Sequence, residues 1–221
     1  MTAVATESHG ARTVPDLLQV RHALVSVFAK ERLEDLLGAL SGRGITIWST
    51  GGTFKELERQ APRFDYRLAA ISDLTGYPEM PGGLVKTLHP KIHAGILAEP
   101  FAADQDAYLE RIETVRFDLV VCNLYPFQEV SRLPGVTVER LRQNIDIGGP
   151  TMLRAAAKNF LRVATVVDPA DYDLLRGDLP LEVRWNLARK AFRHVLDYDR
   201  AISETLDGVD LARLREGYLP R

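Results

Sequence analysis

The stretch GGLVKTLHPKIHAGIL (82–97) carries four side chains that bind or release protons, all within eight residues. They are Lys86, His89, Lys91 and His93. Grouped in this way, they could transfer a proton or hold an anion, although a surface loop could carry the same residues without a function. Pro90 lacks a backbone N–H group and opposes a regular helix or strand at this point. We therefore expect an irregular segment here.

Metal binding and thiol chemistry are the first alternatives to consider. His89 and His93 are four residues apart, the spacing of two ligands on one helix face. Pro90 opposes a helix through His89, and no third ligand is nearby in the sequence, so we expect no metal site. The single cysteine, Cys122, follows a β-branched run and is more typical of a packed strand end than of a nucleophile.

The stretch STGGT (49–53) has the composition of a phosphate-binding turn. Its two glycines allow a ligand close to the backbone, and the first N–H groups of a following helix have no partner inside that helix. Its three hydroxyl side chains add further donors, and we expect that of Thr53 to face the phosphate. Thr53 and Glu56 also have the spacing of a capping box. A tight turn with an N-cap threonine explains the stretch equally well.

A second Gly-Gly turn occurs in NIDIGGPTMLRAAAKN (144–159). Pro150 suits the first position of a helix, and Asp146 lies just before it. Arg154 and Lys158 are four residues apart and therefore share a helix face. Taken alone, this pattern is most typical of an amphipathic helix with two solvated cations.

The elements that must position these residues alternate between strands and helices. Short apolar runs predict strands at 22–28, 45–50, 117–125 and 162–167. Helical spacing predicts helices within 30–44, 53–60, 151–160 and 181–208. The apolar stripe of the last segment consists of Ala188, Ala191, Phe192 and Val195. This order predicts a parallel, doubly wound α/β sheet, in which ligands bind outside the carboxyl ends of the strands.

Composition limits the class of protein. Of 221 residues, 46% are hydrophobic and 26% are charged, enough for one substantial core. The net charge of -2 argues against a nucleic-acid surface. One cysteine fits a reducing compartment, and no apolar run approaches the ~18 residues of a membrane span. We expect a soluble, cytoplasmic protein with a mobile N-terminal arm (1–20), one α/β domain (21–208) and a C-terminal tail (209–221).

In this order, five stretches closely resemble one known family. They are STGGT, VKTLHPKIHAGIL, DLVVCNLYPF, NIDIGGPTMLRAAAKN and VVDPADY. They resemble the inosine monophosphate (IMP) cyclohydrolase domain of the bifunctional purine-biosynthesis protein, which also carries a transformylase. The resemblance runs from about Ala23 to the KAFRHVLDYDRAISETL motif that ends near residue 206. It implies a methylglyoxal-synthase-like fold: a central parallel sheet flanked by helices, with C-terminal helices. It also leads us to expect a free-standing cyclohydrolase, supplied by a separate formyl-transferring enzyme.

The resemblance also implies roles for individual residues. Phosphate, ribose and other substrate contacts would come from Lys30, Ser49, Thr50, Gly51, Gly52, Thr53, Thr87, Cys122, Asn123, Ile147 and Gly148. The catalytic residues would be Lys86, Tyr125, Asp146 and Lys158, the last as proton donor or acceptor. Lys91 and His93 would then be supporting residues. A homodimer is implied by the resemblance alone.

Two departures from the family pattern fall beside the expected ligand. The family reads SVSDKTG after its first strand, and this chain reads SVFAKER, with Phe28 and Ala29 in place of serine and aspartate. The family's DGRVKTLHP is here GGLVKTLHP, with Leu84 in place of an arginine. Each loss of a charged hydrogen bond would weaken binding by about ten- to a hundredfold. We therefore expect altered substrate contacts.

The implied reaction closes a ring on a formamido-imidazole-carboxamide ribonucleotide and releases water. A base must take the amide proton, and a donor must stabilise the formyl oxygen, so neither a metal nor a redox cofactor is required. Three hypotheses stay open: IMP cyclohydrolase in purine synthesis, the same closure on a related nucleotide in a specialised nucleoside pathway, and a non-catalytic nucleotide or phosphate sensor of the same fold. The four catalytic residues argue against the sensor, because a sensor needs no proton relay.

Overall fold

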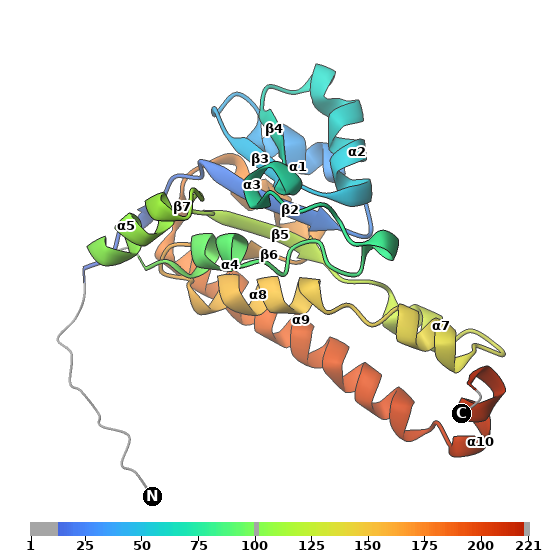
Figure 1. The fold of residues 1–221 in the computed structure, drawn as a ribbon. Helices are drawn as coiled ribbons and strands as arrows, with labels where there is room; N and C mark the ends of the chain where they lie inside the picture. The colour runs from blue at the N-terminus through green and yellow to red at the C-terminus, as the bar shows by residue number, and fades with distance from the viewer. Residues whose placement is uncertain (1–12, 100–101, 219–221) are drawn as a thin grey trace, which may run out of the picture.

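A five-stranded parallel sheet forms the centre of the molecule in the computed structural model, which describes residues 13–99 and 102–218 (Figure 1). The strand order is β4-β3-β2-β5-β6. The strands are β2 (His22–Val27), β3 (Thr46–Ser49), β4 (Arg67–Ala70), β5 (Leu119–Asn123) and β6 (Ala164–Val166). The central parallel sheet flanked by helices is therefore confirmed. Strand β4 is not predicted from the sequence, because its RLAA segment lacks the β-branched residues that mark the other strands.

Both faces of the sheet are buried. Along β5, Leu119 and Val121 pack into one hydrophobic cluster, and Val120 and Cys122 pack into the other. The helices are α1 (Leu33–Leu40), α2 (Gly51–Gln60), α3 (Ile71–Thr75), α4 (Pro90–Leu97), α5 (Ala103–Arg111), α6 (Phe127–Ser131), α7 (Val138–Gln143), α8 (Gly148–Lys158), α9 (Leu181–Asp207) and α10 (Leu211–Gly217). Leucines of α1 cover one face, and α4, α8 and much of α9 cover the other. This double cover explains the continuous apolar runs of the central strands.

Three helical details differ from the sequence-based predictions. Pro90 does not interrupt regular structure but begins α4, where a missing N–H group costs nothing, and the His89 imidazole caps the helix by accepting from the N–H of Lys91 at 3.2 Å. Helix α2 begins two residues before Thr53, with Thr50 as its N-cap, so the predicted capping box is wrong. Phe192 does not belong to the buried stripe of α9 and is 40% exposed.

The described part of the predicted N-terminal arm is anchored. Strand β1 (Leu17–Leu18) pairs antiparallel with β7 (Leu179–Pro180). The fully buried Arg184 donates to the backbone carbonyls of Pro15 and Asp16 at 2.8 and 2.7 Å. Residues 15–18 of the predicted mobile arm thus contact the rest of the domain, and residues 1–12 lie outside the described residues. In the predicted tail, α10 packs beside α7, and Arg213 donates to the Val136 carbonyl at 2.9 Å.

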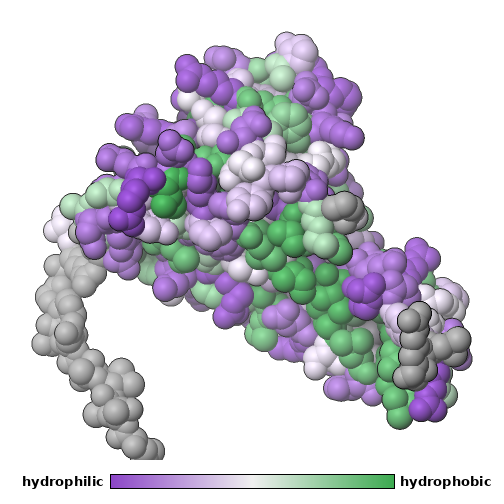
Figure 2. Space-filling model, in the orientation of Figure 1, coloured by the Kyte–Doolittle hydropathy of each residue, from purple (hydrophilic) through white to green (hydrophobic). Residues whose placement is uncertain are grey.

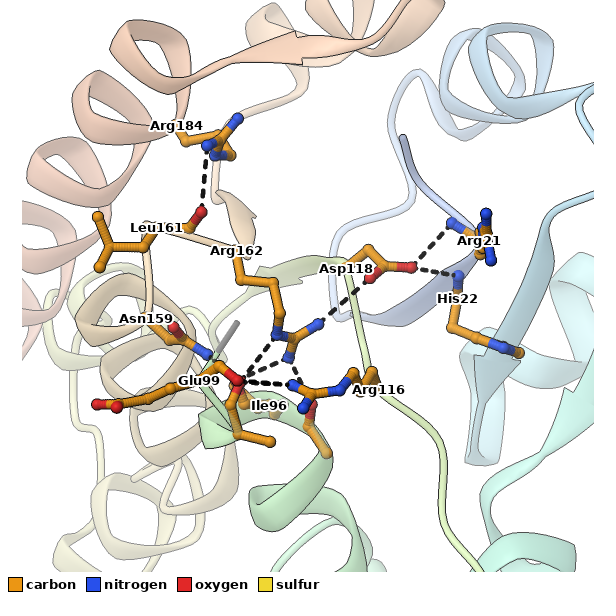
Figure 3. Close-up of polar contacts among 12 residues, drawn as sticks. Arg21, His22, Ile96, Glu99, Arg116, Asp118, Asn159, Leu161, Arg162 and Arg184 are labelled. Carbon is orange, nitrogen blue, oxygen red and sulfur yellow. Dashed lines mark hydrogen bonds and ion pairs between the residues drawn. The ribbon is translucent and has the colours of Figure 1, made fainter. Parts of the chain in front are cut away.

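Polar side chains tie the amino ends of the strands together (Figure 3). The Asp118 carboxylate accepts from the N–H groups of Arg21 and His22 at 2.9 and 3.0 Å and pairs with Arg162 at 3.3 Å. Arg162 also donates to the carbonyls of Gly95 and Ala98, at 2.7 and 2.9 Å. Burial lowers the pKa of Arg162 to about 10, so the guanidinium stays charged at neutral pH. This network fixes α4 against β2 and β5.

The surface is apolar along one side. Figure 2 shows hydrophobic residues gathered over α8 and the outer length of α9. On α9, Trp185, Phe192, Leu196 and Leu206 are exposed by 40 to 55% of their surface. No helix among the described residues is both long and apolar enough to cross a membrane.

Candidate active site

The sheet order places the predicted site residues at the carboxyl ends of the central strands. Strand β2 lies between β3 and β5, so the three carboxyl ends meet where the strand order reverses. Ligands of doubly wound proteins bind at such a point. The registers align Val27 of β2 with Asn123 of β5, and Ser49 ends the neighbouring strand β3. The loops that follow these strands therefore form one continuous rim.

Asn123 shapes the loop after β2. Its side-chain oxygen accepts from the N–H groups of Phe28 and Ala29 at 2.5 and 3.0 Å, and its amide nitrogen donates to the Ala29 carbonyl at 2.9 Å. Lys30 folds back, with its ammonium 3.1 Å from the Phe28 carbonyl. The Asn123 side chain, for which a substrate contact is predicted, thus positions this loop.

Two of the three hydroxyl groups in the STGGT turn bind the backbone of β2. Ser49 is fully buried and donates to the Val25 carbonyl at 2.7 Å. The Thr53 hydroxyl donates to the Val27 carbonyl at 2.9 Å and accepts from the N–H of the same residue at 3.2 Å. The expectation that the Thr53 hydroxyl faces a phosphate is therefore not supported by its geometry. The Thr53 side chain thus holds α2 against the sheet, and the Ser49 side chain joins β3 to β2.

The N-terminus of α2 binds an anion that belongs to the chain itself. The Glu79 carboxylate accepts from the Thr50 hydroxyl and, at 2.9 Å, from the N–H of Gly51. The Lys86 ammonium lies 4.0 Å from the other carboxylate oxygen. Gly51 has a φ of 57°, and a Cβ atom there would lie 2.9 Å from the Lys86 nitrogen. Gly51 therefore provides both the backbone conformation and the space that this arrangement needs.

Lys86 and Thr87 connect the N-termini of two helices. A Cβ atom on Gly83 would lie 2.6 Å from Cε of Lys86, and one on Gly148, the first residue of α8, would lie 3.1 Å from the Thr87 hydroxyl. The buried Thr87 thus contacts α8, and Lys86 contacts α2. The sequence pattern VKT is therefore close to both Gly-Gly turns.

Asp146 is the buried carboxylate of the site. Burial raises its pKa, while hydrogen bonds from the N–H groups of Gly149 and Tyr125 and the charge of Lys86 lower it. The Gly149 N–H lies 2.9 Å from the carboxylate. Burial, followed by the charge of Asp146, raises the pKa of the Tyr125 hydroxyl. The charge of Lys86 thus acts on the protonation of Asp146, and the charge of Asp146 acts on that of Tyr125. Coupling of this kind is typical of a proton-transfer site.

Tyr198 is a residue of this site that the sequence reasoning missed. Its hydroxyl accepts from the Asp146 N–H at 2.8 Å and donates to the Asn144 carbonyl at 3.0 Å. It lies on α9, three residues beyond Val195, so continuing the helical stripe would have found its buried position. Glu79 was also missed, and its contact with α2 has no signal in the local sequence.

The structure does not bring Lys158 to the other predicted catalytic residues. Asp146 precedes the N-terminus of α8, and Lys158 is its last residue. An α-helix of this length separates its two ends by about 15 Å. Lys158 is exposed, as is Arg154, which lies 5.9 Å from the Phe192 ring centre. Within one chain, Lys158 and Asp146 therefore lie at opposite ends of α8.

The other residues singled out in the sequence differ in how far they are exposed to solvent. Ile147 is 59% exposed. Cys122 is buried, and burial raises its pKa, so its thiol is neutral and unsuited to nucleophilic attack. Burial lowers the pKa of His93 on α4. Among residues 13–99 and 102–218, no three or more His, Cys, Asp or Glu side chains are grouped to hold a metal ion.

Two cavities adjoin the site. One, of about 430 Å³, lies beneath the segment that carries Glu79 and Lys86 and is also lined by Thr50. The other, of about 890 Å³, lies between Lys30, Tyr125 and the middle of α9. The Phe28 ring borders this second cavity and meets Tyr125 edge-on, at 5.4 Å between ring centres. Leu84 is 70% exposed.

Comparison with known families decides the affiliation of the chain. Residues 32–151 match the model of the MGS-like domain, and residues 156–218 match that of the AICARFT/IMPCHase bienzyme. The chain belongs to the MGS-like domain family. The fold and the resemblance inferred from the sequence motifs are thereby confirmed.

Several relatives of this MGS-like chain are described as bifunctional purine biosynthesis protein PurH. The protein from Sorangium cellulosum is 44% identical over 210 residues, which cover 90% of this chain and 39% of that protein. The protein from Brucella anthropi is 46% identical over 196 residues, covering 86% and 36%. The chain thus spans less than two fifths of the length of these relatives. The crystal structure of ForH is 35% identical, with a TM-score of 0.72, over 85% of this chain and 97% of that one.

Proposed function

We propose that this MGS-like protein is an enzyme that closes the ring of a formamido-imidazole-carboxamide ribonucleotide, or a close analogue, to form a purine-type nucleotide. The observation that carries the proposal is the grouping of Lys86, Tyr125 and Asp146 beside two helix N-termini at the point where the strand order reverses. The similarity to purine biosynthesis proteins over 90% of the chain supports the same chemistry.

The proposed binding mode follows from charge and from the hydrogen-bond donors at the N-terminus of α2. The 5′-phosphate would bind the Thr50 hydroxyl and the N–H groups of Gly51 and Gly52, with Lys86 nearby. The imidazole and its two substituents would then lie towards Tyr125, Asp146 and the start of α8, where Gly148 leaves the backbone accessible. Lys30 would turn from its own loop towards the ligand.

In the proposed reaction, the carboxamide nitrogen attacks the formyl carbon and forms the new C–N bond. The electron pair of the C=O double bond moves to the oxygen, which receives a proton from Lys86 or Tyr125. Asp146 accepts one proton of the nitrogen. The resulting alcohol then loses water: its hydroxyl leaves with a proton, and the former formamido nitrogen gives up its N–H proton as the C=N bond forms. Burial makes Asp146 a stronger base than an exposed carboxylate, and orientation on one anchored nucleotide lowers the barrier further.

We propose that Lys158 takes part in this scheme from a second chain. Lys158 is the exposed last residue of α8, and hydrophobic surface gathers over α8 and α9 (Figure 2). A homodimer that covered this side could direct the partner's Lys158 towards Asp146. The predicted homodimer and the catalytic role of Lys158 are therefore one proposal.

Phe28 and Leu84 support an altered substrate contact. Phe28 packs against Tyr125, a proposed catalytic residue, and the exposed Leu84 is two residues from Lys86. If the pocket is reshaped, the wild type should process the standard formamido nucleotide slowly, and Leu84→Arg with Phe28→Ser should raise kcat/KM by about tenfold or more. A fast wild type that the double substitution leaves unimproved would assign the protein to ordinary purine synthesis.

The central experiment uses the purified full chain and the standard formamido nucleotide. Ring closure is followed by ultraviolet absorbance, and the loss of one water is followed by mass spectrometry. We expect turnover by the wild type and a loss of about 10²- to 10⁴-fold for Asp146→Asn. Tight nucleotide binding without turnover of this substrate or of analogues with altered bases would instead favour a non-catalytic sensor.

A further inference from the structure

The N-terminus of α2 is occupied by a carboxylate of the same chain. The Glu79 carboxylate contacts the Thr50 hydroxyl, the Gly51 N–H at 2.9 Å and, more loosely, the Lys86 ammonium at 4.0 Å. A helix N-terminus attracts negative charge because its first N–H groups are free and its dipole is positive there. The Glu79 carboxylate therefore supplies the negative charge and the acceptor oxygens that a phosphate would supply at the same point.

Glu79 and a phosphate cannot use these donors together. Each donor would have to serve two anions, and a dianionic phosphate would lie within a few ångströms of the carboxylate, in repulsive contact. Ligand binding as proposed above must therefore move Glu79 away. It must also release Lys86 from its position beside Glu79.

The segment that carries Glu79 is built to move. Gly76, at a φ of 71°, precedes it, and Gly82 and Gly83, at 80° and 70°, follow it. Glycines tolerate changes in these dihedrals more easily than other residues. Between them, Tyr77 and Met80 are exposed by 69 and 49%, and the 430 Å³ cavity lies beneath the segment. Displacement would therefore remove little buried surface from these two side chains.

We propose that Glu79 is an internal anion that fills the phosphate position of the empty site and is displaced when a phosphorylated ligand binds. This inference rests on the proposed function, because it uses the phosphate position assigned there. Glu79 acts as a specificity-determining residue: a phosphate dianion offers more charge and more acceptor oxygens than a carboxylate, and a neutral nucleoside offers neither. The displacement frees Lys86 when a nucleotide arrives, so the ammonium becomes available for proton transfer only in the occupied site.

The test compares Glu79→Gln with Glu58→Gln. Glutamine keeps the size of the side chain and removes its charge. The control residue, Glu58, is exposed and lies near the C-terminal end of α2, far from its N-terminus. Titration calorimetry with inorganic phosphate, IMP and inosine measures binding without requiring turnover. We expect Glu79→Gln to bind phosphate and IMP about tenfold more tightly than the wild type. Inosine affinity should stay within twofold, and Glu58→Gln should behave as the wild type.

The other outcomes would overturn the inference. Unchanged phosphate affinity in Glu79→Gln would show that the carboxylate does not compete for this position. Weaker binding of both IMP and inosine would make Glu79 a direct contact to the ligand. The Gly51 amide resonance provides a second measurement, since phosphate should perturb it in the wild type as Glu79 leaves. Because ring closure is not measured, tighter phosphate binding by Glu79→Gln would stand even if the proposed reaction were not observed.

Discussion

Asp146 is held in a setting that favours its neutral form, although the proposed reaction needs it ionised. Burial raises its pKa, and two backbone N–H groups and Lys86 only partly oppose this effect. A buried carboxylate at neutral pH destabilises the folded chain relative to the unfolded chain, where the group is hydrated. Asp146, the proposed base, should therefore lower the free energy of unfolding at neutral pH.

Asp146→Asn should accordingly abolish turnover while raising the free energy of unfolding by about 1 kcal/mol at pH 7. That gain corresponds to about 2–4 °C in Tm for a chain of this size. The folded-state pKa is raised, so the penalty is full above it and disappears as pH falls below the unfolded value near ~4. Calorimetry should show the advantage of Asp146→Asn shrinking towards acid pH. Asp65→Asn, at an exposed position, should show no such gain.

Tyr198→Phe should lower kcat by about tenfold with little change in KM, because its hydroxyl positions the Asp146 backbone without touching the ligand. Two buried partners would lose their hydrogen bond, so stability should fall by about 1–3 kcal/mol. Tyr66→Phe is the matched control, since the Tyr66 hydroxyl donates to the Leu57 carbonyl at 2.6 Å, outside the site. A similar loss of kcat in both variants would show that Tyr198 acts through stability alone.

At the scale of the elements, β2 and α2 are joined by side chains that the sequence suggested for ligand binding. The Thr53 hydroxyl makes two hydrogen bonds with Val27 of β2. Thr53→Val should therefore destabilise the protein by about 1–3 kcal/mol and leave the affinity for inorganic phosphate within twofold. Chemical denaturation and calorimetry measure the two quantities. Thr151→Val, at an exposed position of α8, should change neither; a selective loss of phosphate binding in Thr53→Val would return its hydroxyl to the ligand.

Four of the five strands could be predicted because they lie in apolar runs rich in β-branched residues, which the fold buries. Strand β4 and helix α4 could not, since one lacks β-branched residues and the other begins at a proline. The motifs drew attention to Lys86, Tyr125 and Asp146, which the fold brings near one another. They could not show which hydroxyl groups the fold itself uses, nor that Glu79 reaches α2. Those contacts depend on tertiary packing, which local spacing does not encode.

At the scale of the whole molecule, the length of α8 makes the role of Lys158 depend on assembly. Asp146→Asn and Lys158→Ala should each be inactive alone. If the partner's Lys158 completes the site, a mixture of the two variants should recover about a quarter of the wild-type rate, because half of the dimers are mixed and each has one intact site. Rates after co-refolding, with dimers verified by light scattering, provide the test. A failure to recover activity, or an active Lys158→Ala, would reject a Lys158 supplied by the second chain.

The pairing of Arg162 with Asp118 has a consequence for how this protein could diverge. These charges lie at the amino ends of the strands, opposite the end at which we propose that the ligand binds (Figure 3). Removing either would leave an uncompensated buried charge, so this edge should tolerate little change. Phe28 and Leu84, at the opposite edge, are exposed, and their replacement leaves no buried partner unsatisfied. A lineage with this architecture can therefore exchange residues around its ligand one at a time, each intermediate remaining folded, and so acquire new substrates by short mutational paths.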